Sequence, residues 1–116
     1  METIQSALKT LQPLTPEQKE MRIATQNAIA RLKELGWCKY QVVNKQGNRC
    51  IVGAFAEESI SHHIGIALRR YYATLIGADF TTHISPMAEF NDAPGTTFEK
   101  VVDSLEELSR RVAEFV

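Results

Sequence analysis

The sequence predicts an α+β fold that is mostly helical, with about four helices and one β-hairpin, residues 37–55, packed against them. Apolar residues recur at three- and four-residue steps along three long segments, which is the period of an amphipathic helix. Between the first and second of these segments the pattern changes to aromatic and β-branched residues around a turn. The length of 116 residues suits one domain, 1–116.

Two helices are expected before the hairpin, over residues 2–11 and 16–35. The second has a clear start, because Thr15 suits the N-cap, Pro16 suits the first helical position and Gln18 completes a capping box. Gly36 is expected to end it, and Pro13 to end the first. The predicted buried face of the helix over 16–35 comprises Met21, Ala24, Ala28, Leu32 and Leu35.

The hairpin prediction depends on two apolar runs. Residues 37–43 are rich in aromatic and β-branched side chains, and residues 50–55 are apolar again. Residues 44–48 between them form a turn cluster that contains glycine. Two such runs around a glycine-containing turn predict a β-hairpin.

A third helix is expected over residues 54–76, ended by Gly77. Gly65 lies inside it and costs about 1 kcal/mol relative to alanine, which indicates close packing or a break near Ser59–Ser61. The predicted apolar face comprises Ile60, Ile64, Leu68, Tyr71 and Leu75.

A long connection is expected over residues 78–95, and loops of that length are often functional. The last helix is expected over 97–115, because Thr96 and Glu99 have the spacing of a capping box. Its early acids and late arginines suit the helix macrodipole.

Composition excludes several classes of function. The formal net charge of −1 argues against a dedicated nucleic-acid binder, which carries a basic excess. No apolar run is long enough for a membrane helix, and the acidic start at Met1–Ile4 lacks the features of a signal peptide. We therefore expect a cytoplasmic protein in which Cys38 and Cys50 are free thiols.

Three short segments carry a family resemblance: residues 36–38 (Gly-Trp-Cys), residues 50–54 (Cys-Ile-Val-Gly-Ala) and residues 90–92 (Phe-Asn-Asp). In this order they resemble an uncharacterised family of small bacterial and phage domains, in which Gly-Trp, Cys-x-x-Gly-Ala and Trp-Asn-Asp segments recur. Phe90 stands where the family has tryptophan. The resemblance covers residues 16–115 and implies a shared fold, but no activity.

Arginines and tyrosines suggest a site for a small anionic, nucleotide-like ligand, because guanidinium groups match phosphates and tyrosine rings stack on bases. On a helix Arg69 and Tyr72 share one face, with Tyr71 toward the core. Arginines that merely cover apolar neighbours are the alternative. The loop before the last helix supplies a further wall in this hypothesis. The candidate binding residues are Arg69, Tyr72, Arg49, Tyr40, Asn91 and Asp92.

The sequence also allows an enzyme. Cys50 precedes a predicted helix start, which lowers a thiol pKa, and His83 follows as a candidate base. The alternative is a buried cysteine and a loop histidine. His62 and His63 are adjacent and therefore diverge on a helix, so neither a metal site nor a cofactor is expected.

We expect a small non-enzymatic binding or interaction protein, a phage or mobile-element accessory that sequesters a small anionic ligand or blocks a host protein. A cysteine-dependent hydrolase or transferase that uses Cys50 and His83 is the first alternative. A homo-oligomeric structural module, built on the apolar helix faces, is the second.

Overall fold

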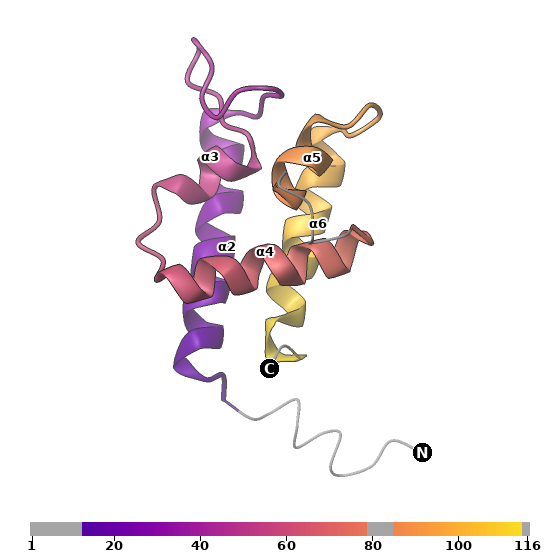
Figure 1. The fold of residues 1–116 in the computed structure, drawn as a ribbon. Coiled ribbons are helices and arrows are strands. Elements are labelled where there is room, and N and C mark those ends of the chain that lie inside the picture. Colours follow the sequence, from indigo (N-terminus) through magenta and orange to yellow (C-terminus); the bar gives the residue numbers. More distant parts are fainter. Residues whose placement is uncertain (1–12, 79–84, 115–116) are drawn as a thin grey trace.

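The structure is a computed structural model and describes residues 13–78 and 85–114. Figure 1 shows two long helices side by side, with a third helix crossing both and two short helices at one end. The predicted helix over 2–11 lies outside the described residues. The elements are α2 (Pro16–Leu35), α3 (Ile51–Ala56), α4 (His62–Ile76), α5 (Pro86–Asp92), α6 (Phe98–Arg111) and the 3₁₀-helix η1 (Val112–Glu114).

The predicted ends of α2 are confirmed. The Oγ1 of Thr15 accepts a hydrogen bond from the N–H of Gln18 at 3.1 Å, and the Oε1 of Gln18 accepts one from the N–H of Thr15 at 2.9 Å. Gly36 ends the helix with a φ of 94°, a conformation that favours glycine, and its N–H bonds the Leu32 carbonyl.

Helices α2 and α6 run antiparallel. Near one end, the Nε of Arg22 donates to the Ser109 carbonyl at 3.1 Å. At the other end, Trp37 just after α2 stacks on Phe98 at the start of α6. Helix α4 crosses this pair, and the three helices enclose the core together with α3 and α5 (Figure 1). The largest fully buried apolar side chains are Tyr72, Leu32, Ile51, Leu68, Leu105, Leu108, Val101 and Val112.

The predicted β-hairpin over 37–55 is wrong. Among the described residues there is no strand, and residues 37–50 form an irregular loop with two isolated bridges, Trp37 to Arg49 and Val43 to Arg49. Tyr40, with a φ of 70°, interrupts any extended run. The second apolar run forms helix α3, because a short apolar run without periodicity suits a buried helix as well as a strand.

The predicted helix over 54–76 is two helices. Helix α3 ends at Ala56 and α4 begins at His62, so of the two readings of Gly65 the structure agrees with the break near Ser59–Ser61, although Gly65 itself lies inside α4. Arg31 of α2 holds the end of α3, because its guanidinium donates to the Ala54 carbonyl at 2.6 Å and pairs with Glu58 at 2.8 Å.

Four further expectations need correction. The connection over 78–95 contains helix α5. The N-cap of α6 is Thr97, not Thr96, because the Oγ1 of Thr97 accepts from the N–H of Lys100. Tyr71 packs against the core as expected, but Tyr72, a predicted binding residue, is fully buried, and Leu35 of the predicted buried face is 38% exposed.

Candidate functional site

One buried side chain joins three distant segments of the chain. Asn91, on α5, is fully buried. Its Oδ1 accepts from the indole Nε1 of Trp37 at 2.6 Å and from the backbone N–H of Ile51 at 3.1 Å. Its Nδ2 donates to the Cys38 carbonyl and to the Oδ1 of Asp92, both at 3.0 Å. The amide therefore uses its full hydrogen-bonding capacity to hold both ends of the loop over residues 37–50.

The loop is fixed to α5 a second time, through Asp92. The Oδ1 of Asp92 accepts from the backbone N–H of Tyr40 at 2.8 Å. The Nζ of Lys39 donates to the Ala93 carbonyl, also at 2.8 Å. Residues 39 and 40 are thus held by the end of α5.

The indole of Trp37 lies between two partners. It stacks on Phe98 with ring centroids 6.1 Å apart and planes at 11°. The ammonium of Lys39 lies 5.8 Å from the indole centroid, within cation–π range. Trp37 therefore docks the start of the loop onto α6 as well as α5.

The far part of the loop is ordered by two asparagines rather than by a strand ladder. The Oδ1 of Asn44 accepts from the N–H of Asn48 at 2.9 Å, and the two side chains bond each other at 3.0 Å. The Nδ2 of Asn48 donates to the Leu35 carbonyl at 2.7 Å, which satisfies an open group at the end of α2. Side-chain bonds of this kind give the backbone an alternative to sheet pairing.

The loop presents apolar side chains to solvent. Tyr40 is 75% exposed, Val42 51% and Val43 46%. We call these three residues the apolar tip. Figure 1 shows the loop projecting beyond the end of the bundle. Exposed apolar residues gathered on one segment mark an interaction surface more often than scattered ones do.

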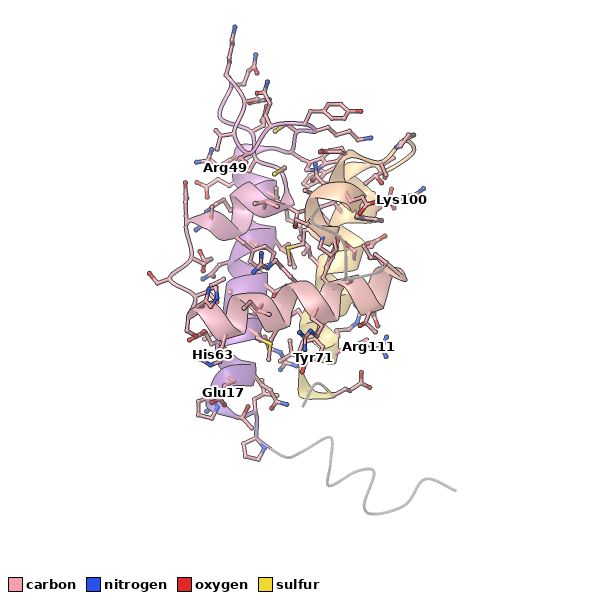
Figure 2. The ribbon with its side chains drawn as sticks, in the orientation of Figure 1. Glu17, Arg49, His63, Tyr71, Lys100 and Arg111 are labelled. Atoms are coloured by element: carbon pink, nitrogen blue, oxygen red, sulfur yellow. The ribbon has the colours of Figure 1, made fainter. Side chains whose placement is uncertain are left out.

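The loop is also basic. Residues 36–50 contain Lys39, Lys45 and Arg49 and no acidic residue. Arg49 pairs through Nη2 with Glu57 at 2.8 Å, and its buried Nε has no hydrogen-bond partner in the described part of the chain. Figure 2 places Arg49 at the foot of the loop. Lys45 is exposed near the turn, so the loop adds positive charge to its apolar tip.

The two candidate binding residues of α4 have different environments. Tyr72 is fully buried, its Oη lies 2.7 Å from the Oγ of Ser104, and its ring meets Phe90 edge-on. Burial raises the pKa of the Tyr72 hydroxyl well above its ordinary value. Arg69 is exposed and lines a pocket between α3, α4 and α5.

Three of the six predicted binding residues meet. Asn91 and Asp92 contact each other, and Asp92 bonds the backbone of Tyr40. Arg49 lies at the end of the same loop and pairs with Glu57. The bonds between Asn91, Asp92 and Tyr40 run through buried amide groups and backbone, whereas Arg69 lies apart from them, in the pocket beside α4.

Both cysteines form hydrogen bonds that order the loop and the start of α3. Cys50 is buried and caps α3, since its Sγ accepts from the N–H of Gly53 at 3.4 Å. The Sγ of Cys38 donates to the Asn48 carbonyl at 3.4 Å. Burial raises the pKa of the Cys38 thiol, and nearby Cys50 raises it further, so this thiol is less acidic than a free one. His83, the predicted base, lies outside the described residues.

His62 and His63 are exposed at the start of α4, and Figure 2 shows His63 at its outer end. Within residues 13–78 and 85–114, no group of three histidine, cysteine or acidic side chains could hold a metal ion. None of the helices in the described part is both long and apolar enough to cross a membrane.

Sequence reasoning missed two parts of this site. Trp37 entered as a strand residue and as part of the Gly-Trp-Cys segment, and its docking of the loop was not predicted. Gly53 allows close approach, because a Cβ there would collide with the Val42 carbonyl oxygen. Both residues belong to the segments on which the family resemblance rests, so that resemblance was the available signal.

The comparisons with known proteins agree with that resemblance at the level of the family. The model of a family of unknown function, DUF6197, matches residues 16–111. No curated protein and no solved structure matches the chain. The matched range includes every element that forms the loop and its anchors.

Proposed function

The chain belongs to this family of unknown function, and we propose that it is a non-enzymatic binding protein that contacts a partner protein through the apolar tip. The observation that carries the proposal is that Tyr40 exposes its ring while its backbone is held in an unfavourable conformation. Its ring is 75% exposed while its backbone is held by Asp92 at a φ of 70°. An L-residue pays about 1–2 kcal/mol for that conformation.

The exposed ring of Tyr40 gains little burial that could offset the strain of its backbone. Such strain persists where the surroundings fix it, and it clusters at functional sites. Here Asp92 and Asn91 supply the fixing bonds. A preorganised loop also loses less conformational entropy on binding than a free one, which favours recognition.

The composition of the loop suits a protein partner. Tyrosine is enriched at the centres of protein interfaces, and isolated lysines add to the polar rim. Tyr40, Val42 and Val43 supply the apolar centre and Lys45 the rim. In a phage or mobile-element setting, such a loop would act by occupying a surface of a host protein.

The test is site-directed photocross-linking with p-benzoylphenylalanine in a lysate of cells that make the protein. We place the probe at Tyr40 and, as a control, at Ile23, an apolar residue of α2 that is 57% exposed. The expected result is one adduct of defined mass from position 40, absent from position 23. A Val42→Ser/Val43→Ser variant should lose that adduct, because both substitutions are at exposed positions that leave the core unchanged.

The outcomes separate the competing functions. An adduct with a different protein supports the proposal. An adduct with a second copy of the chain supports the homo-oligomeric module instead. Equal labelling from positions 40 and 23, or no adduct, contradicts the proposed contact. Retention of the adduct in a Cys50→Ser variant, whose hydroxyl can still cap α3, would argue against a cysteine-dependent reaction as its source.

A further inference from the structure

A second feature of the molecule lies away from the loop. Helices α3, α4 and α5 border a pocket with a volume of about 280 Å³. Its walls are apolar, with Val52 and Phe55 from α3, Leu68 from α4 and Met87 from α5. Ligand pockets have this character, mainly apolar with a few polar groups, and this volume is at the small end of their range.

Gly65 lines the pocket and explains why it is open. Glycine in a helix interior is less favourable than alanine, so such a glycine needs a reason. Close packing is not the reason, because a Cβ built at Gly65 would meet no heavy atom of the described residues within 4 Å. At Gly53 the opposite holds, since a Cβ would collide with the Val42 carbonyl. A side chain at position 65 would enter open space that belongs to the pocket.

Two polar groups accompany the apolar walls. Arg69 lies one turn after Gly65 on the same face of α4, is exposed, and forms no hydrogen bond or ion pair with another of the described residues. Ser85 also lines the pocket, and its buried Oγ has no hydrogen-bond partner among the described residues. A buried hydroxyl normally has a partner, and a polar group of a bound ligand would supply one.

We propose that this pocket binds a small organic acid, with a compact apolar body between α3, α4 and α5 and its carboxylate facing Arg69. The volume and the apolar walls favour such a ligand over a nucleotide, whose sugar and base would leave polar atoms unpaired. The proposal uses none of the loop residues, so it stands independently of the contact through the apolar tip.

The probe is 2-naphthoate, with uncharged 2-naphthamide as its match, titrated calorimetrically into the full chain. The acid should bind saturably and more tightly than the amide, by about fivefold for a partly exposed ion pair. Arg69→Gln should reduce the affinity for the acid to that for the amide. Arg110→Gln, an exposed arginine of α6, is the matched control and should change neither affinity.

Filling the pocket tests its location. Gly65→Leu and Gly65→Met should abolish binding of both probes, while Gly65→Ala, which adds one methyl group, should retain it. Thermal melting of each variant confirms folding, which the open space at position 65 favours. The proposal fails if neither probe binds at millimolar concentration, if the amide binds as well as the acid, or if a folded Gly65→Leu variant binds like the original protein.

Discussion

The indole of Trp37 donates a 2.6 Å hydrogen bond to the Oδ1 of Asn91, a residue 54 positions later in the chain. The same oxygen accepts from the N–H of Ile51, the first residue of α3. The three short segments on which the family resemblance rests therefore meet at one amide. These segments set the path of the loop between α2 and α3, which makes their first role structural.

Replacing Asn91 by alanine should destabilise the protein severely. The substitution leaves the Trp37 indole N–H, the Ile51 N–H and the Cys38 carbonyl without their partner inside the protein. Each buried group left unpaired costs about 1–3 kcal/mol and two of these three bonds are only partly buried, so a total loss of at least about 3 kcal/mol is expected. Urea unfolding followed by circular dichroism measures it.

Asn27 supplies the matched control. Its side chain is exposed and makes one hydrogen bond, to Glu58. Asn27→Ala should change the free energy of unfolding by no more than about 0.5 kcal/mol. Equal effects of the two substitutions would contradict the central place of Asn91.

Two glycines should respond to alanine in opposite directions. Gly53→Ala should destabilise by about 1–3 kcal/mol, because the new methyl group collides with the Val42 carbonyl and must displace the loop. Gly65→Ala should stabilise by about 1 kcal/mol, because α4 gains helix propensity and the methyl group meets nothing. Thermal and urea unfolding of both variants give the comparison; a shift of the same sign in both would refute it.

Local signals were enough to predict α2. The Thr15 capping box, Pro16 and the helix-ending Gly36 all act within a few residues of the boundary they set. The bounds 16–35 therefore followed from the sequence. The break near Ser59–Ser61 did not follow in this way: it was one of two readings of Gly65, and Gly65 lies inside α4.

The loop could not be predicted, because its order comes from distant side chains. The sequence indicated that Asn91 and Asp92 form a turn. Instead they lie on helix α5 and bond Trp37 and Tyr40, which local turn chemistry does not predict. The short apolar run at residues 50–55 has no periodicity that distinguishes a strand from a buried helix, so the sequence did not identify it as helix α3. The sequence predicted Tyr40, Asn91 and Asp92 as site residues but not the docking of Trp37 onto α5 and α6.

Tyr72 should make stability depend on high pH. Burial raises the pKa of its hydroxyl above the ordinary value of 10.0, and the bond to Ser104 opposes this only in part. Above pH 10 the unfolded chain releases this proton while the folded protein keeps it, so the free energy of unfolding falls by up to about 1.4 kcal/mol per pH unit. Below pH 10 both states are protonated and the contribution is complete.

The comparison with Tyr72→Phe isolates this hydroxyl from every other titratable group of the protein, because only position 72 differs. The variant loses the bond between Tyr72 and Ser104, worth about 1 kcal/mol at neutral pH. Its stability should fall less steeply than that of the original protein above pH 10. Parallel pH profiles from urea unfolding would show that Tyr72 is not the group responsible.

Tyr40→Asn should stabilise the fold and weaken partner binding. Asparagine tolerates a φ of 70° better than tyrosine does, so part of the backbone strain is relieved, worth about 0.5–1 kcal/mol. The exposed ring contributes little to the core, and its removal should lower the affinity for the cross-linked partner about tenfold or more, as for an interface anchor. Tyr40→Phe keeps both the strain and the ring, and should resemble the original protein in both measurements.

A residue with a purely structural role could not give this result, because its replacement would lower stability and binding together. Unchanged affinity in Tyr40→Asn would therefore remove the main support for the loop as a contact surface.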